Sequence, residues 1–509
     1  MLALYGVLVA LTGWDLAATP KGFIPAQDQG NFLLSVSLPP GASLGRTDAV
    51  MRDVTHRLLA APEVANASVY AGVDATSGTT ASNSGQAYLI LKSFDERARL
   101  GMSLKEILAD LQARVAPITG ADIKIIQPPP VRGIGSTGGF KLVVEDQGGH
   151  GPQALEAATK ALAEAANQSG DVSKAFVTFN TKTPRLYADI DRDKARILGV
   201  PDGAVFSTLQ TYLGSTFIND FNLFGHTFQV LAQADAPFRD DESQLSELKT
   251  RSTSGAMVPL GSVVNLKHAT GPYRVLRYNL FPAAEVQGEA APGRSTGQAL
   301  DTMERLARTT LPPGYGFEWT ELAYQERLAG NTGLVIFGAA VVFVFLLLAA
   351  LYESVTLPFA VILIVPMCLL AAMVGVNLRG LDNNILTQIG LVVLIGLASK
   401  NAILIVEFAR QGELEHGLDR FAAAVEAART RLRPILMTSF AFILGVIPLA
   451  FATGAGAEMR QALGVAVFFG MIGVTGFGLL FTPVFYVVFR AFAARLPQWR
   501  KTAPRPETP

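Results

Sequence analysis

A single lysine in the middle of an apolar, membrane-length stretch constrains this chain more than any other feature. The stretch runs from Ile385 to Arg410, and Lys400 is its first charged residue. At about 1.5 Å per residue, Lys400 lies roughly 15 Å from Arg410, near the midplane of a hydrocarbon core about 30 Å thick. A charge there costs roughly 3 kcal/mol or more, so such groups usually mark ion paths. The alternative is a lysine that bonds helix carbonyls or extends to a headgroup, but its stem of about 6 Å is too short for the remaining depth.

The sequence offers Lys400 no obvious counter-charge. The other apolar runs, 1–18, 333–352, 357–376, 434–453 and 464–489, contain one acid, Asp15, near the end of its run. Glu407 follows on roughly the same helix face but about 10 Å along the axis. The nearest polar candidates are Asn401 on the same run and Thr438 and Ser439 on the next. Lys400 is therefore either neutral or paired with a charge outside this sequence.

The hydrophobic content predicts a polytopic membrane protein. Half of the 509 residues are hydrophobic, and six apolar runs predict six spans if residues 1–18 count as one. We expect 1–18 to be a helix whose beginning is missing, since the basic segment of a signal peptide does not precede it. Acidic and basic residues balance at 42 each, so nucleic acid is not an implied partner. The one cysteine, Cys368, excludes an intrachain disulfide.

Basic residues in the short loops predict the orientation of these spans. Arginines and lysines gather between the fourth and fifth runs and after the sixth, at Arg410, Arg420, Arg429, Arg431, Arg433, Arg490, Arg495, Arg500, Lys501 and Arg505. Because such residues favour the cytoplasmic side, the C-terminus is predicted to be cytoplasmic and residues 19–332 to lie outside the cytoplasm.

Alternating strand and helix patterns fill the stretch 19–332. Strands are expected near 31–39, 65–71, 86–93 and 121–127 and helices near 44–61 and 103–115, and a second cycle has strands near 140–146, 173–180, 185–191 and 315–320 and helices near 152–168 and 295–311. Two βαβ-type units fit this order, the second interrupted by a β-rich insertion at 216–272. A polar Gly/Ser/Thr loop lies between Tyr70 and Tyr88. It is either an exposed hairpin tip or a flexible gate beside a pocket.

The motifs of hydrolytic enzymes are absent from the sequence. No GxxxxGK[ST] phosphate loop, HExxH or CxxC occurs, and the five histidines have no metal-ligand spacing, so no metal site or cofactor is predicted. An energy-coupled function would then draw on an ion gradient, for which a membrane-buried titratable group is needed.

Five segments resemble a known family of transporters. They are GFIPAQDQG at 22–30, DIDRDKARILGV at 189–200, LAALYESVTLPF at 348–359, GLASKNAILIVEFAR at 396–410 and RLRPILMTSFAFILGVIPL at 431–449. In the same order along nearly the whole chain, they resemble the resistance-nodulation-division efflux permeases of the hydrophobe/amphiphile branch, the acriflavine-resistance type. The resemblance covers only the C-terminal half of such a permease, which has twelve transmembrane helices in two halves.

The resemblance implies a fold class and a division of the chain. The fold class is a membrane α-helical bundle with a large periplasmic α+β region, made of ferredoxin-like porter subdomains and an inserted docking subdomain. The implied divisions are a transmembrane helix at 1–18, one porter subdomain at 19–155, a second at 156–215 and 273–330, the docking subdomain at 216–272, a five-helix bundle at 333–490 and a cytoplasmic tail at 491–509.

The resemblance also assigns roles to individual residues. Lys400 matches the family's proton-relay lysine, Thr438 its relay threonine and Arg431 the arginine at the cytoplasmic mouth of the proton path, with Asn401 beside the relay. The two relay aspartates belong to the half that this sequence lacks. The implied substrate-binding residues are Tyr70, Tyr88, Phe32, Leu33, Phe140 and Leu142. The loop 72–85 falls on the family's switch loop but has Ala75, Ser77 and Thr80 where several drug exporters carry phenylalanines and an arginine.

The expected function is therefore proton-driven export of hydrophobic or amphiphilic compounds from the periplasm and outer leaflet. The protein is expected to lie in the bacterial inner membrane and to have no enzymatic activity. The implied partners are the N-terminal half with the aspartates, a periplasmic adaptor, an outer-membrane channel and further copies in a homotrimer. Export of a lipid, siderophore or signal molecule is the alternative within transport. A non-transporting half-permease is the alternative from another class.

Overall fold

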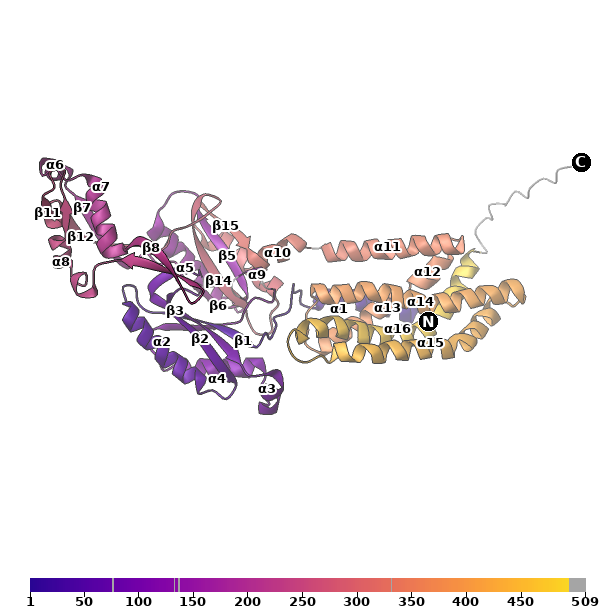
Figure 1. Cartoon of the computed structure of the whole chain (residues 1–509). Helices are drawn as coiled ribbons and strands as arrows, with labels where there is room; N and C mark the ends of the chain where they lie inside the picture. Colours follow the sequence, from indigo (N-terminus) through magenta and orange to yellow (C-terminus); the bar gives the residue numbers. More distant parts are fainter. Residues whose placement is uncertain (76, 132, 136–137, 331, 494–509) are drawn as a thin grey trace, which may run out of the picture. The chain divides into compact units, whose positions relative to one another are not determined.

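The computed structural model describes residues 1–75, 77–131, 133–135, 138–330 and 332–493. The chain divides into two compact units. The first combines Met1–Phe179 with Val275–Pro509, and the second is Asn180–Arg274. Within the first unit, α+β segments with antiparallel sheets are followed by long apolar helices (Figure 1).

The first sheet of unit 1 has the strand order β2-β3-β1-β4. Its elements are β1 (Asn31–Ser37), α2 (Leu44–Leu59), β2 (Val64–Val73), β3 (Thr80–Leu91), α3 (Phe94–Leu100), α4 (Leu104–Val115) and β4 (Asp122–Ile126). Helices α2 and α4 pack on one face, because the buried side chains of β1 and β3 meet those of Met51, Leu58 and Ile107 in one apolar core (Figure 1). Strand β4 pairs with β1 alone, so it is an edge strand.

The second sheet has the order β13-β14-β5-β15, with β6 also paired to β14. Its elements are β5 (Phe140–Asp146), α5 (Pro152–Gln168), β6 (Val172–Val177), β13 (Leu276–Tyr278), β14 (Phe281–Ala290), α9 (Thr296–Thr310) and β15 (Tyr315–Thr320). Helix α10 (Glu321–Ala329) follows β15 directly and leads towards the membrane helices. The helices and strands expected in this region form, and β13 and β14 are additional to them.

Unit 2 is built from short antiparallel pairs. It contains β7 (Thr183–Ile190), α6 (Arg192–Ile197), α7 (Asp202–Leu209), β8 (Thr216–Leu223), β9 (His226–Ala232), α8 (Glu242–Glu247), β10 (Lys249–Arg251), β11 (Met257–Pro259) and β12 (Val264–Gly271). The strand expected at 185–191 forms as β7, but it pairs with β12 and not with the second sheet. The β8–β9 hairpin turns at Phe224 and Gly225, which both have positive φ, as a two-residue hairpin turn requires.

Among the residues that the structure describes, five helical segments are long and apolar enough to cross a membrane. They are α11 (Thr332–Tyr352), α12 with α13 (Leu357–Ile362 and Val365–Leu378), α14 (Ile385–Glu415), α15 (Arg420–Ala450) and α16 (Ala457–Ala493). The prediction of six spans is confirmed for these five. The remaining helix, α1 (Leu2–Ala18), is apolar but only 17 residues long, and it packs against α13. Helix α16 contacts α13, α14 and α15, and Phe481, Phe485 and Tyr486 are fully buried there.

Candidate functional site

Helices α14 and α15 pack together and carry the polar residues of the predicted relay. Asn401 on α14 is buried, and its amide nitrogen donates a hydrogen bond to the hydroxyl of Ser439 on α15 at 3.2 Å. Thr438 is exposed, and its hydroxyl donates to the carbonyl of Ile435, one turn earlier, at 3.1 Å. The structure thus joins the two helices through Asn401 and Ser439 and leaves the Thr438 hydroxyl on its own helix.

Lys400 lies on an exposed face of α14. Ile389, Val393 and Gly396 precede it at helical spacing and are exposed as well. Within the described part of the chain, no ion pair includes Lys400. Lys400 thus faces away from the interior of the helix bundle that the structure describes.

Arg431 lies near the start of the apolar part of α15. Its guanidinium carbon is 3.2 Å from the centroid of the Phe408 ring on α14, a cation–π contact between the helices. Its buried Nε has no hydrogen-bond partner among the residues that the structure describes. The Arg431 guanidinium therefore packs on an aromatic ring, and its Nε–H can still donate a hydrogen bond.

Tyr70 and Tyr88 lie on the neighbouring strands β2 and β3. Their ring centroids are 6.4 Å apart and nearly perpendicular, and both side chains are about half exposed. The structure therefore brings these two predicted pocket residues together on the surface of the first sheet. An exposed pair of aromatic rings is suited to stacking on an apolar or aromatic compound.

The other predicted substrate-binding residues are buried. Phe32 lies in the core of the first sheet, and Phe140 and Leu142 lie in the core of the second, where Phe140 packs edge-on against Trp319. Leu33 belongs to a small apolar cluster with Ala75 and Ile126, against which Phe176 packs. Ile126 and Phe176, which share the cluster of Leu33, line the cleft that the structure reveals.

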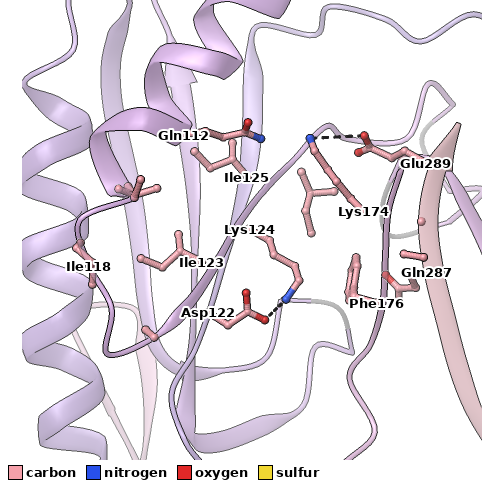
Figure 2. Close-up of a pocket in the computed structure, with 17 residues that line it drawn as sticks. Gln112, Ile118, Asp122, Ile123, Lys124, Ile125, Lys174, Phe176, Gln287 and Glu289 are labelled. Carbon is pink, nitrogen blue, oxygen red and sulfur yellow. Dashed lines mark hydrogen bonds and ion pairs between the residues drawn. The ribbon is translucent and has the colours of Figure 1, made fainter. Parts of the chain in front are cut away.

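A cleft of about 520 Å³ lies between edge strands β4 and β6 (Figure 2). Its lining combines apolar side chains of α4 and β4 with charged and aromatic ones, among them Ile118, Ile125, Lys124, Lys174, Phe176 and Glu289. The sequence predictions did not include the charged residues. The available signal was the pair of opposite charges, Asp122 and Lys124, in the strand sequence DIKII at 122–126.

A second cavity, about 820 Å³, lies where α9, α10, α11 and α14 begin or end. Residues 17–23 form another wall, which is fixed by a hydrogen bond from the Asn383 nitrogen to the Pro20 carbonyl at 2.9 Å. Glu326 of α10 faces this cavity and accepts a hydrogen bond from the Thr296 hydroxyl at 2.8 Å. Burial raises the pKa of Glu326 to about 7, although Thr296 and Arg327 oppose the shift.

Comparison with known proteins identifies the family. The model of the AcrB/AcrD/AcrF family matches residues 1–490. The chain belongs to this family of resistance-nodulation-division efflux transporters. Its members are secondary transporters and not enzymes, and together with the five span candidates the family makes the chain a multi-pass inner-membrane protein. Pumps of the family generally act in tripartite complexes.

Three relatives illustrate the similarity. The multidrug/solvent efflux pump membrane transporter MepB of Pseudomonas putida is 38% identical over 510 residues, which is 100% of this chain and 48% of MepB. The multidrug export protein AcrF of Escherichia coli K12 is 37% identical over 490 residues, 96% of this chain and 47% of AcrF. The multidrug resistance protein MdtF of the same strain is 37% identical over 478 residues, 94% of this chain and 46% of MdtF. The chain thus spans about half the length of these relatives.

Proposed function

We propose that the chain is the C-terminal half of a proton-driven permease that exports hydrophobic or amphiphilic compounds across the cell envelope. The observation that carries this proposal is the exposed, membrane-central Lys400 on α14. A cation on the outer face of a helical bundle costs free energy in lipid, so a carboxylate on a second bundle is its natural partner. That second bundle is the N-terminal half with the relay aspartates.

In this proposal, proton transfer changes the partner of Lys400. When the aspartates are ionised, they hold the Lys400 ammonium. When they are protonated, Lys400 turns towards Thr438 and Asn401, and Arg431 stands at the cytoplasmic end of the path. Because Asn401 already links α14 to α15 through Ser439, a shift of Lys400 would be passed to both helices.

The porter and docking roles are part of the same proposal. Residues 19–332 would lie in the periplasm, with the two sheets of unit 1 as ferredoxin-like porter subdomains that move relative to the membrane bundle. Tyr70 and Tyr88 would contact substrates. The docking subdomain at 216–272, which lies within unit 2, would serve assembly with the adaptor, the outer-membrane channel and further copies in a homotrimer. Its β8–β9 hairpin supports this role, because it exposes the apolar side chains Phe217, Ile218, Phe221, Leu223, Phe224, Phe228, Val230 and Leu231.

The test is export from proteoliposomes that contain both halves under an imposed pH gradient. Lys400→Met should abolish proton-coupled export at normal expression, because the aspartates would stay protonated without their cation. Lys400→Arg should retain at most part of the activity, since the planar guanidinium pairs in a different geometry.

Ser399→Ala is the matched control, because the Ser399 hydroxyl donates a hydrogen bond to the Ile395 carbonyl of its own helix. It should leave export unchanged. Parental export by Lys400→Met would contradict the relay assignment.

A further inference from the structure

The cleft between β4 and β6 joins the edges of two different sheets. Strand β4 pairs with β1 alone, and β6 pairs with β14 alone. The cavity therefore has one wall from each α+β sheet of unit 1 (Figure 2). A compound that fills it would contact side chains of both strands.

Lys124 on β4 reaches across this cleft to the opposite strand. Its ammonium lies 4.7 Å from the centroid of the Phe176 ring on β6 and forms an ion pair with Asp122 of its own strand (Figure 2). Phe176 also packs against Leu33 and Ile126. The apolar cluster thus covers part of the ring, and the Lys124 ammonium lies over it as well. An aromatic compound can stack on this face of the Phe176 ring only if it displaces the Lys124 ammonium.

Charges balance across the cleft. Lys124 pairs with Asp122 on one wall, and the Lys174 ammonium lies 3.8 Å from a Glu289 carboxylate oxygen on the other. Loss of Lys124 would leave the Asp122 carboxylate without its partner and give the cleft a net negative charge. The same change would uncover Phe176. Both effects favour an aromatic cation and disfavour an anion.

A purely structural role for Lys124 is the alternative. Lysines on edge strands prevent pairing with another strand, and β4 and β6 face each other with free edges. This role requires a charge on the strand. It does not require the contact between the ammonium and the Phe176 ring.

We propose that Lys124 is a specificity-determining residue of this cleft. Because of Lys124, the cleft binds neutral and anionic amphiphiles in preference to aromatic cations. The proposal rests on the proposed export function, because it assigns substrate selectivity to the cleft. Lys124 acts by occupying the ring face that a cation would use and by neutralising Asp122.

The test measures binding to the purified full chain in detergent by equilibrium dialysis. The two probes are tetraphenylphosphonium and tetraphenylborate, which have the same tetraphenyl shape and opposite charge, and a protein-free micelle sample corrects for partitioning. Lys124→Met should raise the ratio of cation to anion affinity roughly tenfold. Lys124→Arg, which keeps the charge and can stack on Phe176, should keep the parental ratio.

Two further variants separate the causes. The double variant with Lys124→Met and Asp122→Asn makes the cleft neutral again. Its ratio of cation to anion affinity should return most of the way to the parental value. Lys105→Met, on the exposed side of α4 and outside the cleft, should leave it unchanged.

An unchanged ratio in Lys124→Met, an equal shift in Lys105→Met, or the absence of binding of both probes to the parental chain would overturn the proposal. Failure of the export function would appear differently. Proteoliposomes would then show no transport although the binding ratio still shifted.

Discussion

Glu326 on α10 is a carboxylate whose pKa is shifted by its surroundings. It is half-buried beside the cavity at the start of α11, and burial raises its pKa to about 7. The nearby charges are mixed, because Arg327 favours ionisation whereas Asp382 and Asp301 oppose it. Lys21 also lines the cavity. Near neutral pH, Glu326 therefore exists in both protonation states, which makes it sensitive to the acidity of the compartment that it faces.

This pKa predicts how stability depends on pH. The unfolded chain loses the Glu326 proton near the ordinary carboxyl value of about 4.5, whereas the folded chain keeps it up to about 7. Between these values the folded state binds more protons, so its stability falls as the pH rises. Glu326→Gln should reduce the difference in the free energy of unfolding between low and high pH by roughly 1–3 kcal/mol. This amount allows for the partial exposure of the Glu326 side chain.

The measurement is the thermal unfolding midpoint of the purified chain at pH 5 and pH 8. Glu318→Gln, at an exposed position on β15, is the control and should keep the parental difference. An equal pH dependence in Glu326→Gln and in the parental chain would contradict the assignment.

At the scale of elements, glycines set how closely the helices around α16 approach one another. A methyl group at Gly464 would lie 2.5 Å from the Ala450 nitrogen and 2.6 Å from the Leu449 carbonyl carbon of α15. Gly473 meets Ala371 of α13 in the same way. These positions face backbone or short side chains that cannot rotate away. Gly476, on the same helix, has open space where a methyl group would be.

Alanine substitutions at Gly464 and Gly476 should therefore affect the stability of the bundle in different directions. Gly464→Ala should destabilise the bundle by about 1–3 kcal/mol, because α15 must move away. Gly476→Ala should be neutral or slightly stabilising, since alanine is the better helix former by up to about 1 kcal/mol. Thermal unfolding in detergent would compare the two variants. Equal midpoints would show that α15 and α16 do not pack as closely as described.

Local sequence patterns predicted the long helices and most strands of the two sheets of unit 1. They did not predict the short helices α3, α6, α7, α8 and α10, or which strands pair. The apolar runs locate the five spans because hydropathy is a property of consecutive residues. Strand β14 was missed, since its sequence FPAAEVQGEA has a proline, a glycine and three alanines in place of β-branched residues. Its burial between β5 and β6 compensates for that weak propensity. The pairing of β7 with β12 joins residues far apart in sequence, which no local pattern encodes.

The residues of the candidate site also differ in whether the sequence alone could predict them. Lys400 was found because one charge in an apolar run is visible in the sequence alone. Lys124 and Phe176 meet only because two sheet edges come together, so the cleft required the fold. Phe32 and Leu142 were predicted as substrate contacts, and that prediction has not been tested. Their burial in sheet cores already accounts for their apolar character.

At the scale of the whole molecule, the membrane helices are buried unequally. Helices α13, α14 and α16 bury much of their length, whereas α11 and α15 leave most of theirs exposed. Apolar side chains such as Met437, Phe440 and Leu444 lie on the exposed part of α15 near Thr438. Lipid can cover those side chains at little cost. Lys400 differs, because lipid offers a cation no compensation.

This difference predicts that one substitution has opposite effects in two settings. In the chain alone, reconstituted in lipid nanodiscs, Lys400→Met should raise the thermal unfolding midpoint, because an uncompensated charge costing roughly 3 kcal/mol in a membrane is removed. In the assembly with the N-terminal half, the same variant should lower the midpoint, because the aspartates would lose their buried cation. Thr438→Val, which removes a hydroxyl bonded to its own helix, should change the midpoint by less in both settings. Destabilisation of the chain alone by Lys400→Met would mean that Lys400 has its partner within this sequence, and the proposed second half would no longer be needed to explain it.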